Sequence, residues 1–231
     1  MASPRDYKNT IVPNWCPGCG DYGIQNAISA VCAKKGWANE DITLISGIGC
    51  SSRIGGYQYC YGAHTTHGRA LPFAQGIKCA NKDQNMIVCS GDGDSYAIGL
   101  GHAMHAIKRN MDITYLVFDN QVYGLTKGQT SPASDKGFVT KTTPDGNPLT
   151  PLDAPAMALA AGATFVAQAY AIDSSFDDVD HGLAVDSISL CYEEKDSVAF
   201  GDIVPSKDVR LIDHVEKPSA ELFEDLCKEF R

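Results

Sequence analysis

The chain has little positive charge and no strongly apolar run. Its 19 lysines and arginines stand against 28 acidic residues, for a net charge of −9. That balance argues against a nucleic-acid backbone or an anionic membrane as the main partner. The longest uncharged stretch, 154–172, is rich in alanine and too weakly apolar for a membrane span, and residues 1–10 lack the apolar core of a signal peptide. We therefore expect a cytoplasmic protein without a membrane span.

The sequence also lacks a Walker A motif and a GxGxxG motif, which removes the usual indications of nucleotide binding. Its composition is that of an ordinary globular protein, with 44% hydrophobic and 20% charged residues among 231. A chain of this length can bury a core without disulfides or structural metal. In a cytoplasmic protein, its nine cysteines favour metal or redox roles over disulfides.

Apolar runs and helical periodicities alternate along the chain. Short, mainly apolar strands are predicted at 42–45, 86–89 and 113–118, and helices at 21–35, 68–79 and 96–108. Apolar strands that alternate with helices are typical of a parallel sheet covered on both faces. We predict an α/β fold with a mostly parallel central sheet flanked by helices. Ligands of such a sheet bind at the carboxyl ends of its strands, here in loops 46–53, 91–95 and 119–129.

The chain divides into three predicted parts. Residues 1–20 form an irregular arm, residues 21–191 form the α/β domain, and residues 192–231 form a C-terminal extension that ends in an amphipathic helix at 219–231. Residues 127–153 contain four prolines and three glycines and are predicted to form a long irregular loop. Loops of that length are usually functional or disordered.

Two polar strand-end loops have the composition of a magnesium site. Asp92 lies in the sequence Gly91-Asp92-Gly93-Asp94 after one predicted strand, and Asn120 follows the next strand 28 residues later. Carboxylate and amide oxygens are hard ligands suited to Mg²⁺, which completes its coordination with phosphate oxygens and water. A carbonyl oxygen at Val122 could be the third protein ligand, and the glycines would let phosphates approach the backbone closely. The alternative is that this sequence is only a tight turn between strand and helix.

The cysteines suggest a second metal site. Cys16 and Cys19 form a Cys-x-x-Cys pair, which suits zinc, an iron–sulfur cluster or a redox pair. Cys50 is the natural third ligand because it lies in a glycine-rich loop at a strand end. Cys191 is the best-placed candidate for a fourth, since it follows a loosely alternating apolar run. The other cysteines are predicted to be small buried hydrophobes: Cys32, Cys60, Cys79, Cys89 and Cys227.

These residues lie in stretches that resemble the β subunit of 2-oxoacid:ferredoxin oxidoreductases. The matching stretches are WCPGCGDYGI from Trp15, SGIGCSSRI from Ser46, HTTHGRALPFAQGIK from His64, SGDGDSYAIGLGHAMHAIKRN from Ser90, FDNQVYGLTKGQTSP from Phe118 and ALAAGATFVA from Ala158. The resemblance extends from about residue 11 to residue 172. It implies a thiamine diphosphate-binding fold and an oxidoreductase that decarboxylates a 2-oxo acid with coenzyme A and passes electrons to ferredoxin in anaerobic metabolism.

The resemblance also implies three cofactors and their ligands. Magnesium would be held by Asp92, Asn120 and the Val122 carbonyl, and a 4Fe–4S cluster by Cys16, Cys19 and Cys50, with Cys191 as the fourth candidate. Thiamine diphosphate would be lined by Ile48, Gly49, Cys50, Ser51, His67, Gly93, Asp94, Gly124, Leu125 and Thr126. Leu125 would force the bent form of the cofactor, and Lys127 would lie near the substrate. An α subunit is implied as the partner chain.

Two interpretations apply to Arg53, to His67 and to the identity of the substrate. Arg53 could pair with a substrate carboxylate or be an ordinary surface arginine, and His67 could donate to a diphosphate or only to backbone. The sequence Cys50-Ser-Ser-Arg53 is more similar to the 2-oxoglutarate-type members, with a pyruvate-type or broad-range enzyme as the alternative. A non-catalytic zinc-binding scaffold or regulatory subunit of the same fold is the alternative of another class. The family pattern fades after residue 172.

Overall fold

The computed structural model describes residues 2–171, 187–191 and 210–214. Its strands are β1 (Ile42–Ser46), β2 (Tyr61–His64), β3 (Asn85–Gly91), β4 (Thr114–Asp119), β5 (Val122–Tyr123), β6 (Gln129–Thr130), β7 (Phe165–Tyr170), β8 (Ser187–Cys191) and β9 (Arg210–His214). Its α-helices are α1 (Gly20–Lys35), α2 (Ala70–Ala80), α3 (Leu100–Arg109) and α4 (Ala154–Ala161). Short helical turns occupy Pro4–Tyr7, Asn39–Asp41, Ser51–Gly56 and Asp94–Ile98. The helix predicted at 219–231 lies outside the described residues.

The main sheet has seven strands in the order β2-β1-β3-β4-β8-β7-β9. The first four are mutually parallel, whereas β8 pairs antiparallel with both β4 and β7, and β9 pairs antiparallel with β7. Every residue of β1 is buried, and so are the inner residues of β3 and β4. This pattern is expected of parallel strands that are covered on both faces. The predicted α/β fold is confirmed.

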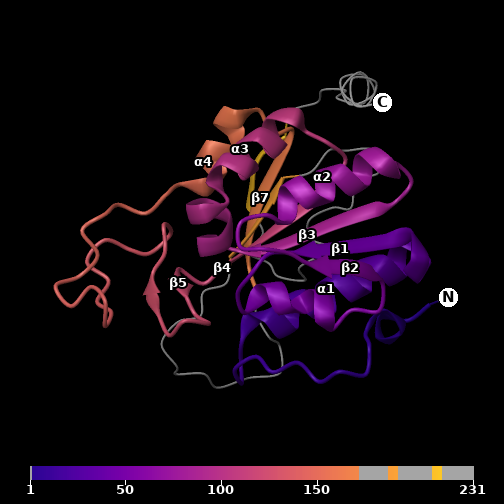
Figure 1. The fold of residues 1–231 in the computed structure, drawn as a ribbon, viewed down its shortest axis with the longest axis horizontal. Coiled ribbons are helices and arrows are strands. Elements are labelled where there is room, and N and C mark those ends of the chain that lie inside the picture. The colour runs from indigo at the N-terminus through magenta and orange to yellow at the C-terminus, as the bar shows by residue number, and fades with distance from the viewer. Residues whose placement is uncertain (1, 172–186, 192–209, 215–231) are drawn as a thin grey trace.

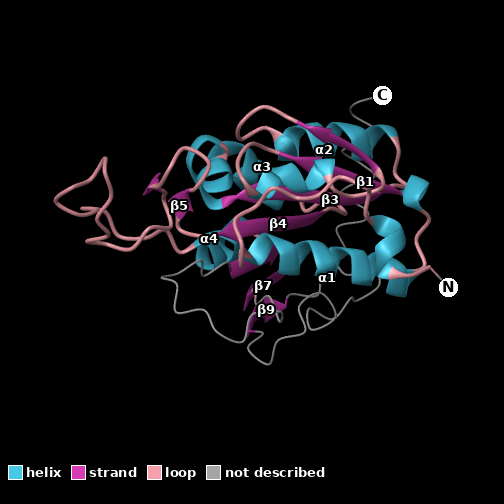
Figure 2. Ribbon diagram, turned by 90° about the horizontal axis from the view of Figure 1, so that it is seen from below, coloured by secondary structure: helices cyan, strands magenta, loops and turns pink. Residues whose placement is uncertain are grey.

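Helices cover both faces of the sheet (Figures 1 and 2). On one face, α1 packs Ile24, Ile28 and Val31 into a core that includes Leu44 of β1. On the other face, α2 and α3 enclose a second core around Val88 of β3. Because the parallel strands point the same way, the loops after β1, β3 and β4 meet at one edge of the sheet.

The chain between β3 and α3 differs from the predicted helix at 96–108. It first makes a single π-helical turn, Asp94–Ile98, in which the Gly99 N–H donates to the Asp94 carbonyl at 3.0 Å. A Cβ on Gly99 would lie 2.4 Å from that carbonyl, so the turn requires glycine there. Single π turns of this kind are frequent at functional sites. The regular helix α3 begins only at Leu100.

The predicted irregular loop at 127–153 is present as an extended arm (Figure 1). It contains the short strand β6, which pairs with β5, and no longer helix or strand before α4. Hydrogen bonds cross the arm at 2.7 Å from the Gly137 N–H to the Asn147 carbonyl and at 2.9 Å from the Asn147 N–H to the Phe138 carbonyl. The arm therefore has a defined conformation.

Candidate active site

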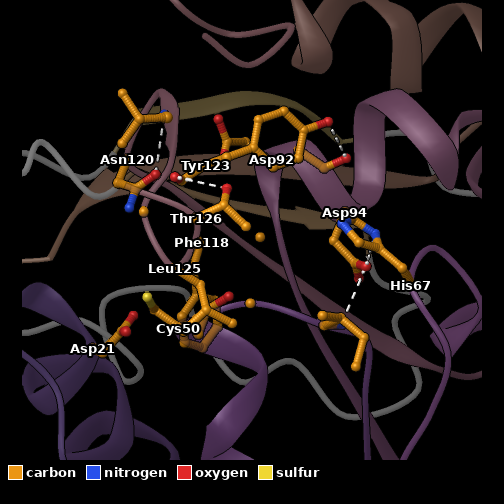
Figure 3. Close-up of a pocket in the computed structure, with 17 residues that line it drawn as sticks. Asp21, Cys50, His67, Asp92, Asp94, Phe118, Asn120, Tyr123, Leu125 and Thr126 are labelled. Atoms are coloured by element: carbon orange, nitrogen blue, oxygen red, sulfur yellow. Dashed lines mark hydrogen bonds and ion pairs between the residues drawn. The ribbon is translucent and has the colours of Figure 1, made fainter. Parts of the chain in front are cut away.

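One pocket lies where the loops after β1, β3 and β4 meet (Figure 3). All thirteen residues predicted to hold magnesium or line the cofactor also line this pocket: Ile48, Gly49, Cys50, Ser51, His67, Asp92, Gly93, Asp94, Asn120, Val122, Gly124, Leu125 and Thr126. Four others complete its wall: Asp21, Gly91, Phe118 and Tyr123. Asp21 and Tyr123 were not predicted as site residues, although both belong to stretches that carry the resemblance. The loops that carry Asp92 and Asn120, which are well separated in sequence, therefore meet at one pocket, as their positions after neighbouring strands had predicted.

Asp92 is a buried carboxylate at the floor of this pocket, with 2% of its surface exposed. Burial and the neighbouring Asp119 carboxylate raise its pKa to about 7, against a lowering by hydrogen bonds from the Ser131 hydroxyl and the Gly93 backbone. Asn120 faces the same pocket, and its Oδ1 accepts the Val122 N–H at 3.1 Å. A cation would stabilise the buried Asp92 carboxylate beside the half-buried Asp119 carboxylate, because it favours the charged form of both. The donor set of Asp92, Asn120 and a backbone carbonyl fits Mg²⁺.

The carboxylate of Asp94 does not face solvent; it accepts hydrogen bonds from two other strand-end loops. Its Oδ1 accepts the Ile48 N–H at 3.2 Å and the Gly68 N–H at 2.7 Å, and it lies 2.7 Å from His67 Nδ1 (Figure 3). The side chain is 1% exposed. Asp94 was predicted to line the cofactor, and within the pocket it also sets the position of the loop after β1 and of His67.

Substitution of Gly47 by alanine is expected to damage this arrangement. A Cβ on Gly47 would lie 1.7 Å from Asp94 Oδ2, so the carboxylate would have to leave its three partners. We expect a loss of about 1–3 kcal/mol in the free energy of unfolding, as for other overpacked sites. Urea unfolding measures this loss. Gly56→Ala is the matched control, because a Cβ there meets nothing within 4 Å. Equal stability of the two variants would contradict the role given to Asp94.

Glycines in the pocket wall allow the backbone to come close to a ligand. A Cβ on Gly93 would lie 2.3 Å from Cε1 of Tyr123, whose hydroxyl donates to the Gly93 carbonyl at 3.3 Å. A Cβ on Gly91 would lie 3.2 Å from Ser51 Oγ. Glycine at these positions keeps the loop after β3 in contact with its neighbours and leaves the cavity open. A narrow cavity lined by glycine backbone and hard oxygen donors fits a magnesium-bound diphosphate.

Three predicted cysteine ligands come from two segments that are held together. The Trp15 indole N–H donates to the Cys50 carbonyl at 2.7 Å, and its ring contacts Tyr22 and Tyr57 edge-on at centroid distances of 5.2 and 4.9 Å. This contact ties the arm that carries Cys16 and Cys19 to the loop that carries Cys50. Burial raises the pKa of the Cys50 thiol, and the Asp21 carboxylate and the Cys16 thiol raise it further.

Cys50 also belongs to the cofactor pocket. A Cβ added to Gly124 would lie 3.6 Å from Cys50 Sγ, which places this sulfur against the loop of Leu125. Among the described residues, no three histidine, cysteine or acidic side chains lie close enough to hold one metal ion.

The structure does not bring Cys191 to the other three cysteines. In the register of β4 with β8, Cys191 pairs with Tyr115, near the amino-terminal end of β4. The pocket lies at the other end, beyond Asp119, which pairs with Ser187. Four residues of strand separate the two positions, about 13 Å. The backbone therefore does not support the expectation that Cys191 joins the other three cysteines as a fourth ligand.

Asp21 is the buried acid that the sequence analysis missed. It lies in the first turn of α1, is 4% exposed, and shares the pocket wall with Cys50 (Figure 3). Burial raises its pKa to about 7, against a lowering by a hydrogen bond with Cys19. Its position two residues after Cys19 of the Cys-x-x-Cys pair was the available signal. Asp21 therefore contacts one of the predicted cluster ligands and also lines the cofactor pocket.

Two predicted substrate contacts do not line the pocket. Arg53 is exposed, and its Nε donates to the Tyr57 hydroxyl at 3.1 Å. Lys127 is also exposed and has a positive φ of 79°, in the turn after Thr126. Arg53 lies in the helical turn that begins at Ser51, and Lys127 directly follows Thr126, so each is close in sequence to a residue of the pocket wall.

Comparison with known proteins identifies the class. Residues 47–187 match the family model described as "Thiamine pyrophosphate enzyme, C-terminal TPP binding domain". The chain belongs to this family of thiamine pyrophosphate enzymes. The match includes the loops after β1, β3 and β4 and the strands β2, β3, β4 and β7, so the fold is that of a thiamine diphosphate-binding domain. None of the described helices has the length and apolar character needed to cross a membrane.

Its relatives are β subunits of 2-oxoacid oxidoreductases, which agrees with the resemblance stated from the sequence. The chain is 47% identical over 165 residues to 2-oxoglutarate oxidoreductase subunit KorB of Mycobacterium tuberculosis, covering 71% of this chain and 44% of that one. It is 46% identical over 169 residues to 2-oxoglutarate synthase subunit KorB of Archaeoglobus fulgidus, covering 72% and 63%. The chain spans about half the length of these curated relatives.

A solved structure supports the same grouping. The 2-oxoglutarate:ferredoxin oxidoreductase from Magnetococcus marinus, with 2-oxoglutarate, coenzyme A and succinyl-CoA bound, is similar to this chain with a TM-score of 0.70 and 43% sequence identity. The similarity covers 71% of this chain and 56% of that one.

Proposed function

We propose that this chain is the thiamine diphosphate-binding β subunit of a 2-oxoacid:ferredoxin oxidoreductase, with 2-oxoglutarate as the favoured substrate. The observation that carries the proposal is the convergence of three strand-end loops on one pocket, whose wall includes both the buried carboxylate of Asp92 and the amide of Asn120. The named relatives act on 2-oxoglutarate or 2-oxo acids. Coenzyme A as acyl acceptor, ferredoxin as electron acceptor and an α subunit as partner belong to the same proposal.

In this proposal the residues of the pocket orient the cofactor. Asp92, Asn120 and the Val122 carbonyl would hold Mg²⁺, which would bind the diphosphate. His67, held by Asp94, would donate to a phosphate oxygen. The side chain of Leu125, which is 52% exposed within the pocket wall, would contact the cofactor rings and hold them bent. When bound, thiamine diphosphate supplies the carbanion nucleophile and the electron sink for loss of CO₂.

Cys16, Cys19 and Cys50 would hold a 4Fe–4S cluster beside this pocket. The position of Cys50 Sγ against the loop of Gly124 and Leu125 supports a cluster within electron-transfer distance of the cofactor. Thiolate-ligated clusters can reach strongly reducing potentials, which suits electron transfer to ferredoxin under anaerobic conditions. Arg53 and Lys127, which are exposed and follow pocket residues in sequence, would contact the substrate once the partner subunit completes the site.

Anaerobic purification with the partner subunit tests the proposed function. We expect bound thiamine diphosphate, iron and sulfide, together with reduction of a redox dye that depends on both coenzyme A and a 2-oxo acid. Rates with 2-oxoglutarate and pyruvate distinguish the favoured enzyme from the pyruvate-type alternative. A colourless protein with stoichiometric zinc and no thiamine diphosphate would instead indicate the non-catalytic scaffold, and would contradict the proposal.

A further inference from the structure

The arm after β6 begins with a tight buried turn, Ser131–Ser134. Both serines are buried, at 7% and 1% exposure. The Ser134 N–H donates to the Ser131 carbonyl at 3.2 Å, and the Ser131 N–H donates to Ser134 Oγ at 2.8 Å. The Ala133 N–H donates to Ser131 Oγ at 3.2 Å. Each hydroxyl oxygen thus accepts a backbone N–H of the turn, and its single proton remains to be donated elsewhere.

Those two protons go to two different strand-end loops. The Ser131 hydroxyl donates to Asp92 Oδ2, in the loop after β3. The Ser134 hydroxyl donates to the carbonyl of Gln121, in the loop after β4. Gln121 lies between Asn120 and Val122 and has a positive φ of 60°. One rigid turn therefore contacts both loops that carry the proposed magnesium ligands.

The turn is itself anchored from the far side of the arm. Asn147 is 5% exposed, and its Nδ2 donates to the Ser134 carbonyl at 2.9 Å and to the Asp135 carbonyl at 3.2 Å. The Leu152 N–H donates to the Pro132 carbonyl at 2.8 Å. The outgoing and returning segments of the arm thus hold the turn in place against the two loops.

We propose that Ser131 and Ser134 are positioning residues that set the spacing of the magnesium ligands. The Ser131 hydrogen bond orients the Asp92 carboxylate and leaves other lone pairs for a cation, because a carboxylate has about four acceptor sites. The Ser134 hydrogen bond holds the strained turn that presents Asn120 and the Val122 carbonyl. Hydrogen bonds to metal ligands of this kind typically change metal affinity 10- to 100-fold. This inference rests on the proposed function, since it assumes a magnesium-bound diphosphate.

The test is the magnesium dependence of thiamine diphosphate binding. Equilibrium dialysis of the whole protein, purified with any partner subunit, gives the Mg²⁺ concentration for half-maximal cofactor retention. We expect Ser131→Ala and Ser134→Ala each to raise that concentration about 10- to 100-fold. Retention at saturating Mg²⁺ should recover, because the ligands themselves remain. Thr142→Ala is the matched control, since it removes an exposed hydroxyl from the same arm.

The possible outcomes distinguish the positioning role of Ser131 and Ser134 from the proposed function on which it rests. If the unsubstituted protein binds thiamine diphosphate and both serine variants need the same Mg²⁺ concentration as it does, the positioning role is wrong and the proposed function stands. If the unsubstituted protein binds no thiamine diphosphate at any Mg²⁺ concentration, both are overturned. Far-UV circular dichroism of each variant without Mg²⁺ shows whether the chain is folded. A variant that unfolds only because the arm is lost would also fail to recover at saturating Mg²⁺, and that result counts against the positioning role.

Discussion

The Asp92→Asn variant is expected to lose magnesium-dependent thiamine diphosphate binding while folding at least as stably as the unsubstituted chain without metal. Asparagine keeps the shape of the side chain and can still accept the Ser131 hydroxyl proton, so the contacts of the arm survive. It removes the negative charge that would face the cation. Loss of a direct ligand should weaken binding by more than the roughly 10- to 100-fold that an outer hydrogen-bond partner costs.

The stability half of this prediction follows from the pKa of Asp92. Burial and Asp119 raise the pKa of Asp92 from 3.8 to about 7 in the metal-free fold. Below pH 4 the carboxyl is protonated in both folded and unfolded chains, so the raised pKa has no effect on stability. Between pH 4 and pH 7 the unfolded chain ionises first, and the fold loses stability as pH rises, on the order of a few kcal/mol. Asp92→Asn should lack this loss.

Two measurements test this prediction, one of stability and one of cofactor retention. Urea unfolding with a chelator at pH 5 and pH 8 should show a larger decrease in stability for the unsubstituted protein than for Asp92→Asn. The decrease that remains in the variant comes in part from Asp21, whose pKa is also raised to about 7. Bound thiamine diphosphate after desalting measures retention. Asp135→Asn, an exposed carboxylate on the arm, is the control for loss of one charge. Normal cofactor occupancy in Asp92→Asn would refute the magnesium assignment.

The second large effect is expected from Cys50→Ala, which should remove iron and leave the sheet folded. Only the Cys50 backbone carbonyl is used by Trp15, so the arm stays attached when the thiol is removed. A cluster that loses one of its converging thiolates is expected to be lost or to bind incompletely during purification. We expect iron and sulfide per chain, together with visible absorption, to fall to a small fraction of the unsubstituted values after anaerobic purification.

Cys79→Ala is the matched control for that experiment. Cys79 lies in α2 and packs against the core on the opposite face from α1, far in the fold from the Cys-x-x-Cys arm. Its loss should leave iron content unchanged. Unaltered iron in Cys50→Ala would show that Cys50 does not ligate the cluster, and would favour a role for Cys50 in the cofactor pocket alone.

The sequence by itself determined the buried strands and the helices that surround the pocket, and the residue types that line it. Buried strands such as β3 and β4 are continuous apolar runs, and each is followed by a polar, glycine-rich loop, because local composition specifies strand and turn. The residue types of Asp92 and Asn120 already indicated hard-cation binding. Their meeting in one pocket was predictable because parallel strands bring their carboxyl ends to a common edge.

The tertiary structure alone decided what depends on strand direction and on contacts between distant segments. Cys191 ends an apolar run, which in a parallel strand would bring it to the pocket edge. Because β8 pairs antiparallel with β4, that end points the other way. The place of Asp21 in the pocket, and the hydrogen bonds of Ser131 and Ser134 to loops 10 or more residues away, are likewise set by packing. No local pattern records these contacts, since each depends on segments that only the folded chain brings together.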